Sequence, residues 1–407
     1  MNRGIFQAGE GALPPSLAGR TILQIIPRLD AGGAERTTID IAAALVHAGA
    51  RALVASEGGR LVADLQAAGG IFVPFPARTK NPFRMLSNVG RLARLIEREG
   101  VDLVHARSRA PAWVAMAASS RTGRPFVTTY HGDYSSGSPA KRIYNSVMAR
   151  GDRVIANSHY TSSRILGAYP QAAPRVVVIA RGTDLRKFSR NAVDAARVAK
   201  VRAQWGVTSD ERVVLLPGRL TDWKGQKILI DAAKILRDRG VTGVKYVLAG
   251  DPQGRKGYVQ SLEARIRDHD LADCVVLVGH CADMPAAIVA SSAVTSPSTD
   301  PEAFGRVAVE AQAMGAPVIV SDLGGARETV VSPPESSASE RTGWRVPPGD
   351  ATALADSIAE ALAMGASARA SLAKRARAYV EERFTLDGMA RATLETYAEL
   401  LAAPRKG

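Results

Sequence analysis

Two glutamates with seven residues between them carry the clearest chemical signal in this 407-residue chain. Glu302 and Glu310 lie in the segment SPSTDPEAFGRVAVEAQAMG. We expect AVTSPS to be a strand, so Glu302 falls in the loop beyond it and Glu310 lies about two turns into a helix that starts near Phe304. The two carboxylates would then flank a helix N-terminus, where amides near Gly305 and Arg306 attract a phosphate. Paired carboxylates hold vicinal hydroxyls well, because their oxygens only accept hydrogen bonds. The spacing is equally compatible with one capping and one exposed glutamate.

A basic motif opens the second half of the chain, in the segment LLPGRLTDWKGQ. Arg219 follows a strand that ends in glycine, and Lys224 comes five residues later at a helix start. Two fixed cations suit a diphosphate, which otherwise needs a metal ion to neutralise it. Exposed arginine and lysine are common, so the position after a strand is what gives this motif weight.

Two weaker motifs follow strands in the first half of the chain. In PRLDAGGAERTT, Gly32 and Gly33 open a helix, which would let backbone amides approach an anion closely. The pattern is not GxGxxG, so a dinucleotide fingerprint is absent, and a simple turn remains an alternative. In TTYHGDY, His131 stands at a strand end, where a polar side chain can point into a cleft. His105 has a similar position, and a structural role is the more common one for a lone histidine of this kind.

Short β-branched runs alternate with helical patterns, the rhythm of parallel α/β sheets. This predicts two doubly wound Rossmann-like domains that face each other across a cleft, since ligands bind outside the carboxyl ends of such strands. We expect an N-terminal domain over residues 1–184, a charged connector over 185–210 and a C-terminal domain over 211–384. The helical tail, 385–407, would cross back to the N-terminal domain.

The composition indicates a globular protein, with 46% hydrophobic and 23% charged residues. No apolar run reaches the roughly 18 to 20 residues of a membrane helix, and the N-terminus lacks a secretory h-region. Two cysteines are too few for a disulfide framework or a zinc site. We therefore expect a cytoplasmic protein.

The net charge of +14 is unevenly distributed. Residues 1–184 hold 23 Lys+Arg against 12 Asp+Glu, whereas residues 185–407 hold 30 against 27. Such a field attracts nucleic acid, anionic lipid or phosphorylated substrates, although a high-GC genome would also raise the arginine content. The basic residues are not interleaved with aromatics, so we expect no nucleic-acid partner.

The segment NPFRMLSNVGRLARLIEREG predicts an amphipathic helix with arginines beside its apolar face. A helix that lies on an anionic membrane has this pattern, and so does an outer helix whose apolar face packs on the sheet. The apolar face consists of Met85, Val89, Leu92 and Ile96. The sequence leaves both interpretations open, including a peripheral location on the inner face of the plasma membrane.

Taken in order, the motifs resemble those of the retaining glycosyltransferases of family 4, which have the GT-B fold. The resemblance rests on the GG loop, the strand-end histidine, G-R-x4-K, and E-x7-E within EAFGRVAVEAQAMGAPVIVSDLGGARE. It covers nearly the whole chain, including IANSHYTSSRI, IARGTDLRKF and GWRVPPGD. Two departures are Arg181, where many relatives carry asparagine, and Ala303, where glycine is frequent.

The resemblance implies an enzyme that moves a sugar from a UDP- or GDP-linked donor to a cell-envelope glycan or lipid-linked acceptor, such as lipopolysaccharide core. It implies that Glu310 binds the ribose hydroxyls and that Glu302 contacts the sugar. Arg219 and Lys224 would neutralise the diphosphate, so neither a metal nor another cofactor is expected.

The resemblance further implies contacts from the other motifs. Gly33, preceded by Gly32, would approach the diphosphate by its backbone, and His131 would contact the sugar near the reacting carbon. Phe304, Gly305 and Arg306 complete the expected donor-binding set.

Two alternatives belong to other functional classes. The first is a nucleotide-sugar epimerase of the same fold, which would need an acid/base pair near the sugar and does not use these motifs together. The second is a non-catalytic protein that binds a sugar nucleotide or a membrane surface. The intact polar residues at every motif argue against such a loss of activity.

Overall fold

The computed structural model describes residues 15–30, 32–132, 134 and 137–403. The N-terminal residues considered above for a secretory leader mostly lie outside these ranges. The chain forms two compact units, one comprising Met1–Gly182 with Leu386–Gly407 and the other Thr183–Thr385. We call them the N-terminal and the C-terminal domain, and describe each by itself.

The N-terminal domain is built on a seven-stranded parallel sheet in the order β3-β2-β1-β4-β5-β6-β7. Strand β1 is buried along its whole length, as expected for a parallel strand that is covered on both faces. The strands are β1 (Thr21–Ile25), β2 (Arg51–Ser56), β3 (Ile71–Pro74), β4 (Leu103–Ala106), β5 (Phe126–Tyr130), β6 (Arg153–Ala156) and β7 (Val176–Val178).

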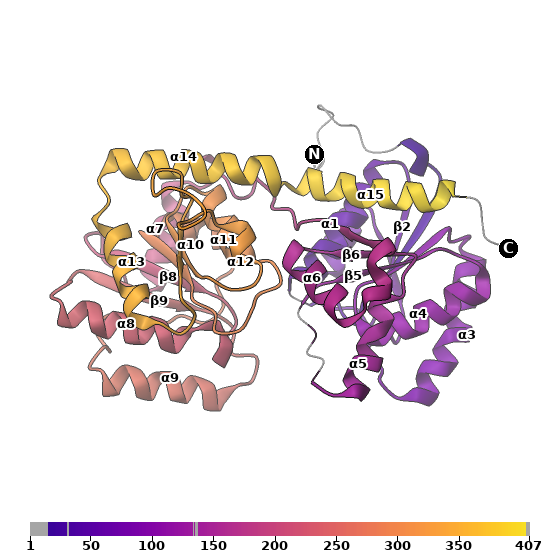
Figure 1. Ribbon diagram of the computed structural model, residues 1–407, viewed down its shortest axis with the longest axis horizontal. Helices are drawn as coiled ribbons and strands as arrows, with labels where there is room; N and C mark the ends of the chain where they lie inside the picture. The colour runs from indigo at the N-terminus through magenta and orange to yellow at the C-terminus, as the bar shows by residue number, and fades with distance from the viewer. Residues whose placement is uncertain (1–14, 31, 133, 135–136, 404–407) are drawn as a thin grey trace. The chain divides into compact units, whose positions relative to one another are not determined.

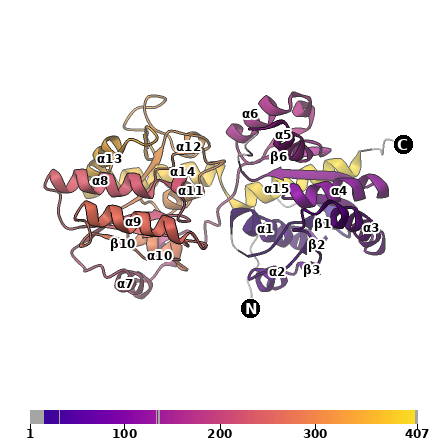
Figure 2. The same cartoon turned by 90° about the horizontal axis from the view of Figure 1, so that it is seen from below.

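Helices connect these strands in the right order for a doubly wound sheet (Figure 1). Figure 2 shows α3 and α4 side by side, and the two helices are in contact. The helices of this domain are α1 (Gly33–His47), α2 (Val62–Ala67), α3 (Pro82–Arg98), α4 (Arg109–Thr122), α5 (Pro139–Ser146), α6 (His159–Ala168) and α15 (Leu386–Ala402).

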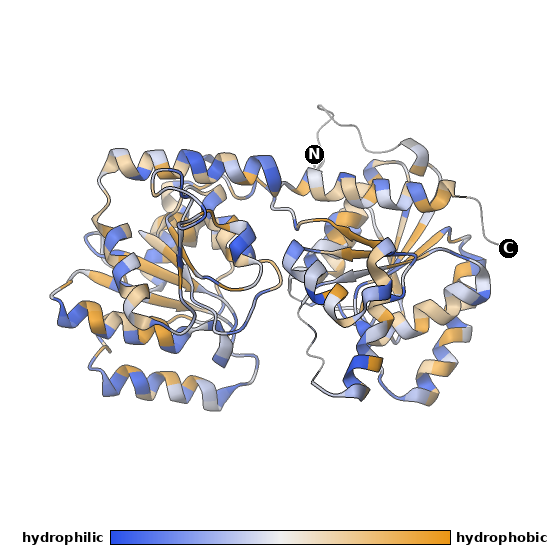
Figure 3. Ribbon diagram, in the orientation of Figure 1, coloured by the Kyte–Doolittle hydropathy of each residue, from blue (hydrophilic) through white to orange (hydrophobic). Residues whose placement is uncertain are grey.

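The C-terminal domain repeats the architecture with a six-stranded parallel sheet, in the order β10-β9-β8-β11-β12-β13. Figure 3 shows hydrophobic strands in both sheets and polar stripes along the helices outside them. The strands are β8 (Arg212–Pro217), β9 (Val244–Ala249), β10 (Val275–Leu277), β11 (Ala293–Ser296), β12 (Val318–Ser321) and β13 (Trp344–Val346). The helices are α7 (Ala195–Gln204), α8 (Gln226–Asp238), α9 (Lys256–Asp268), α10 (Met284–Val289), α11 (Arg306–Ala313), α12 (Ala326–Thr329), α13 (Ala351–Ala363) and α14 (Ala366–Arg383).

The segment expected as a connector, 185–210, is part of the C-terminal domain's structure rather than a separate linker. It contains α7, which packs against α10. Arg197 on α7 holds both carboxylate oxygens of Asp283 at 2.7 Å. At the other boundary, Thr183 and Thr385 form a β-bridge, so the chain enters and leaves this domain at neighbouring points.

The last helix, α15, is anchored in the N-terminal domain by a buried hydrogen-bond chain. Tyr397 is fully buried, and its hydroxyl lies 2.5 Å from Nδ1 of His105. The other ring nitrogen of His105 lies 2.7 Å from Oγ1 of Thr129. Both nitrogens of His105 are therefore engaged inside the core, which gives this histidine a structural role.

Helix α3 presents its apolar face to the interior of the N-terminal domain. Leu92 and Ile96 are fully buried, and Met85 and Val89 pack against the same core cluster. This face is therefore not available to a membrane, and the alternative of an outer helix packed on the domain holds for these four residues. Of the helices in the described ranges, none combines the length and the apolar character that crossing a membrane requires.

Candidate active site

The topology of the C-terminal sheet brings two of the sequence motifs to one place. The strand order reverses between β8 and β11, which are neighbours in the sheet although they lie far apart in the chain. The loop after β8 carries Arg219 and Lys224, and the loop after β11 carries Glu302. In open α/β sheets, this reversal point at the carboxyl ends of the strands is where ligands bind.

A close approach of two loops fixes the position of Lys224. Gly225, the residue that follows it, has a φ of 76°, which glycine adopts without strain. A Cβ atom on Gly225 would lie 1.9 Å from the carbonyl oxygen of Pro297, which follows β11. Only glycine therefore fits here, and the fit holds the β8 loop against the β11 loop.

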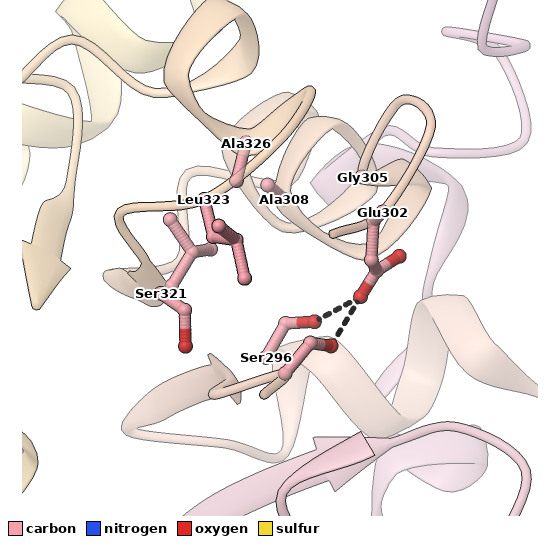
Figure 4. A pocket seen from close by; sticks show the side chains of 9 residues that line it. Ser296, Glu302, Gly305, Ala308, Ser321, Leu323 and Ala326 are labelled. Carbon is pink, nitrogen blue, oxygen red and sulfur yellow. Dashed lines mark hydrogen bonds between the residues drawn. The ribbon is translucent and has the colours of Figure 1, made fainter. Parts of the chain in front are cut away.

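Glu302 is held by three polar partners. Its Oε1 lies 2.8 Å from Nζ of Lys224, and both side chains are largely buried. The hydroxyls of Ser296 and Ser298 donate to the same oxygen at 3.0 and 2.7 Å. Figure 4 shows that both serine bonds end on one carboxylate oxygen while the other oxygen points away. The orientation of the carboxylate is thus fixed, and its second oxygen is directed away from the two serines.

The electrostatic surroundings keep Glu302 ionised. Burial acts to raise the pKa of this carboxyl, but the charge of Lys224 and the hydrogen bonds from Lys224, Ser298 and Ser296 outweigh it. The net effect is a pKa below the ordinary value. Glu302 is therefore an acceptor at neutral pH rather than an acid.

Glu310 forms a second carboxylate–cation pair, one helical turn apart on α11. Its Oε1 lies 2.6 Å from Nη2 of Arg306, and Glu310 is 7% exposed. The sequence placed Glu310 inside this helix correctly but did not reveal the pairing with Arg306. Gly305 precedes the helix with a φ of 90° and lines a small cavity together with Glu302.

The other residues of this domain that the sequence predicted to bind the nucleotide sugar differ in solvent exposure. Arg219 is exposed, and no side chain in the described ranges pairs with its guanidinium. Phe304 is 3% exposed, and its ring packs edge-on against Phe384 with centroids 5.4 Å apart. Only the backbone of Phe304 can reach a ligand. The expected contact of Phe304 with the nucleotide sugar is therefore restricted to its backbone.

Two glycines that sequence reasoning did not single out hold the Glu302 loop. The amide of Gly325 donates to the carbonyl of Glu302 at 2.8 Å. A Cβ on Gly324 would lie 2.6 Å from that carbonyl oxygen, and one on Gly325 would lie 2.6 Å from Cα of Phe304. The signal was present as the GG pair in SDLGGARE, after the strand next to β11.

The N-terminal domain holds the other expected site residues. Gly32 precedes α1 with a φ of 148°, and Gly33 is the first residue of this helix, so the backbone amides of its first turn lie at the carboxyl end of β1. His131 follows β5, and Nη2 of Arg181 lies 3.0 Å from its Nδ1 and 3.2 Å from its carbonyl oxygen. Burial, together with the charges of Arg181 and Arg107, holds the pKa of His131 well below its ordinary value.

The lining of a cavity of about 20 Å³ at the carboxyl ends of β4, β5 and β6 contains polar atoms that have no partner among the described residues. They include Nη2 of Arg107, Nε2 of His131 and Nδ2 of Asn157, all buried and unbonded to any of the described residues. Arg107 is otherwise held by Gln24, to whose Oε1 its Nε donates at 2.7 Å. The cavity is rich in donors, and a group with acceptor oxygens would satisfy them.

A larger cavity of about 400 Å³ lies beside α5 and α6 in the same domain. Its lining combines aromatic rings with guanidinium groups, and it includes Tyr130, Tyr134, Arg142, Tyr160, Arg164 and Tyr169. Rings and guanidinium groups of this kind suit sugar faces and anionic substituents. In the described ranges, no cluster of three or more His, Cys, Asp or Glu residues could hold a metal ion.

Comparison with known proteins defines the class. Residues 31–187 match the family described as Glycosyltransferase Family 4, and residues 198–379 match Glycosyl transferases group 1. A crystal structure of a glycosyltransferase from Rickettsia africae ESF-5 is 32% identical, with a TM-score of 0.86 over 95% of this chain and 100% of that one. Two Rossmann-like domains and these structural neighbours establish the GT-B fold predicted from the sequence.

The chain belongs to the glycosyltransferases of family 4. Among curated proteins, it is 30% identical to the D-inositol 3-phosphate glycosyltransferase of Xylanimonas cellulosilytica, over 91% of this chain and 92% of the other. The structure of Anabaena Alr3699/HepE in complex with UDP-glucose is 30% identical, with a TM-score of 0.81 over 93% and 99% of the two chains. The match spans 92% of the length of the Xylanimonas cellulosilytica protein and 65% of the length of the D-inositol 3-phosphate glycosyltransferase of Salinispora tropica.

Proposed function

We propose that the protein is a retaining, metal-independent glycosyltransferase that moves a hexosyl group from a UDP-linked sugar to a phosphate-bearing glycan, glycolipid or polyol. The observation that carries the proposal is the buried Glu302–Lys224 pair at the point where the strand order of the C-terminal sheet reverses. It combines an oriented acceptor for sugar hydroxyls with a fixed cation.

The choice of a UDP donor draws on the relatives. Anabaena Alr3699/HepE, whose structures contain UDP and UDP-glucose, is similar to this chain over nearly its whole length. We propose that Glu310 receives the ribose hydroxyls, since its carboxylate is already oriented by Arg306. A GDP-linked donor is the competing outcome of the experiment below.

The leaving diphosphate gains negative charge as the bond from the sugar C1 to its oxygen breaks. We propose that Arg219, Lys224 and the N-terminus of α11 stabilise this charge, because groups already held in place need no reorganisation in the transition state. The acceptor oxygen forms its bond to C1 on the face that the diphosphate leaves. The proton of the acceptor hydroxyl passes to a phosphate oxygen, so atoms and charge balance without a metal.

The charge of residues 1–184 and the arginine- and tyrosine-lined cavity beside α5 and α6 support the proposal of an anionic acceptor. Lipopolysaccharide core and inositol phosphate both satisfy this chemistry, and the curated relatives are named for the latter substrate. We also propose that the N-terminal domain contacts anionic membrane peripherally from the cytoplasmic side. Phe83 and Leu86, near the start of α3, are 84% and 74% exposed and would provide apolar contacts.

A panel of nucleotide sugars tests the proposal. We expect UDP-hexoses to raise the melting temperature by binding the folded state and to be hydrolysed slowly without acceptor. NMR of the product should show the donor's anomeric configuration, and EDTA should leave the rate unchanged. Inverted product, or activity that EDTA abolishes and magnesium restores, would contradict the mechanism. A free epimerised nucleotide sugar as the product would instead indicate the epimerase.

A further inference from the structure

The Arg181–His131 contact determines which ring nitrogen of His131 carries the proton. A guanidinium group has only donors, and it stays protonated in proteins. Nη2 of Arg181 lies 3.0 Å from Nδ1 of His131, so Nδ1 must present its lone pair. The same Nη2 donates to the carbonyl oxygen of His131 at 3.2 Å, which fixes the ring relative to its own backbone. In a neutral imidazole the proton must then be on Nε2.

Nε2 of His131 is a buried donor with nothing to donate to among the described residues. It lines the cavity of about 20 Å³ that also receives the unbonded Nη2 of Arg107 and Nδ2 of Asn157. Unmatched donors gathered at one cavity are costly unless an oxygen acceptor enters it, because each loses its bond to water on burial. A sugar hydroxyl oxygen or a water molecule has the required chemistry, and the test separates these.

We propose that Arg181 is a positioning residue that fixes His131 as the tautomer protonated on Nε2, so that this ring donates one hydrogen bond to an oxygen of the transferred sugar. The tautomer follows from the contact alone. The identity of the acceptor oxygen rests on the proposed function.

The surroundings of His131 oppose a second proton on the ring. Arg181 from the segment after β7, and Arg107 and His105 from β4 and its end, face it, and the hydroxyl of Tyr134 bonds its backbone. Burial is the largest cause that lowers the pKa of His131, and the cations add to it. His131 thus remains a neutral donor in the physiological range and does not serve as a general acid or base.

The first test is the ¹⁵N NMR spectrum of the imidazole nitrogens of the full-length protein, which has six histidines. His131→Gln assigns the His131 signals. We expect an unprotonated Nδ1 and a protonated Nε2, with no change of protonation from pH 8 down through the ordinary histidine pKa of about 6.5. A ring protonated on Nδ1, or one that titrates near 6.5, would overturn the proposal whatever the substrate proves to be.

Substitutions of Arg181 then separate its effect on the protonation of His131 from the mere loss of a large side chain. Arg181→Lys retains a cation that only donates and should preserve the tautomer. Arg181→Glu places an acceptor against Nδ1, so it should move the proton to Nδ1 and raise the pKa of His131. Arg181→Met removes the donor without adding an acceptor and should raise the pKa. Arg20→Met, at the amino end of β1, removes one exposed cation as a control.

Kinetics with a UDP-sugar complete the test. We expect Arg181→Met and His131→Gln to lower kcat by about 10-fold or more, the equivalent of one hydrogen bond, while UDP affinity stays unchanged. The double variant should be no slower than His131→Gln, because Arg181 acts through the ring. A pH-independent loss that is additive in the double variant would show that Arg181 acts otherwise. The tautomer should stay the same when the sugar binds, whereas the Nε2 proton signal should shift. If that signal is unperturbed on binding, water is the occupant of the cavity and the role in sugar binding is refuted.

Discussion

The reversal point of strand order in the C-terminal sheet and the cavity at β4, β5 and β6 in the N-terminal domain have opposite polar linings. In the C-terminal domain, the two glutamates of the E-x7-E motif are each paired with a cation, Glu302 with Lys224 and Glu310 with Arg306. In the N-terminal domain, the cavity at β4, β5 and β6 has donors and, among the described residues, no carboxylate in its lining. The first arrangement suits a ligand that carries both hydroxyls and phosphates, whereas the second suits a group that presents only oxygen acceptors.

This difference indicates a division of labour within one topology. Carboxylates paired with cations are held in a fixed orientation without a ligand, so the C-terminal site is preorganised. The N-terminal donors that are unbonded among the described residues are satisfied only when an acceptor arrives. We infer that the C-terminal domain supplies nucleotide and diphosphate binding, and that the N-terminal donors contribute to the sugar.

The largest expected effect tests the paired C-terminal site. Glu302→Ala and Arg219→Ala should each lower kcat by about 100-fold or more, if they act on charge that develops in the transition state. Steady-state kinetics with the preferred donor measure this. Glu382→Ala, on the exposed end of α14, is a control for removal of one carboxylate. Folded variants with wild-type kcat would remove these residues from the mechanism.

The buried anchor of α15 is expected to give the next largest effect. Tyr397→Phe deletes the hydroxyl that pairs with His105 and leaves a buried nitrogen without a partner, which should lower the free energy of unfolding by about 1–3 kcal/mol. Urea denaturation measures the change. Tyr379→Phe, whose hydroxyl bonds a backbone carbonyl in the C-terminal domain at 2.7 Å, is the matched control. If both variants lose equally little unfolding free energy, the hydrogen-bond chain through His105 contributes little to stability.

Acid should weaken the Glu302 site in a defined direction. The pKa of Glu302 is lowered in the folded protein, so its ionisation stabilises the fold above the unfolded pKa of about 4.5, and this contribution is lost as the pH falls through the lower folded value. Glu302→Gln should therefore destabilise the protein at pH 7, and the difference from wild type should shrink below pH 4.5. Denaturation curves at several pH values measure this. A difference that grows in acid would contradict the sign.

The charge contrast between the two halves gives the smallest and most salt-sensitive prediction. Vesicles with anionic lipid should sediment the protein at low salt and release it as salt screens the attraction, which is worth roughly 1 kcal/mol per basic residue near the surface. Phe83→Ser with Leu86→Ser should reduce this binding, whereas Ile71→Ser, at a sheet edge, should not. Equal partitioning onto neutral vesicles, or none onto either kind, would remove the membrane contact and leave the charge to acceptor recognition.

The sequence predicted the local framework of the C-terminal site well. The strand before Glu302, the helix that contains Glu310 and the loop with Lys224 follow from local patterns, because strand and helix periodicity and glycine positions are read within a few residues. Helix α11 begins at Arg306, close to the expected start near Phe304.

Contacts between distant segments could not be predicted in the same way. The Lys224–Glu302 pair depends on the close packing of Gly225 against Pro297, and the Arg181–His131 contact joins residues that are 50 positions apart. The sequence likewise could not predict what the apolar face of α3 packs against. An apolar stripe beside arginines has the same pattern whether it meets a sheet or a lipid surface. Only the fold shows that Leu92 and Ile96 lie in the core.

Calorimetric titration with UDP alone tests the division of labour most directly. Since UDP contains the ribose and the diphosphate but no sugar to be transferred, we expect Glu310→Ala to weaken its binding by about 10-fold or more, the equivalent of at least one hydrogen bond to a charged group, and His131→Gln to leave it unchanged. Glu382→Ala should match the wild type. UDP affinity that depends on His131 and not on Glu310 would contradict the account.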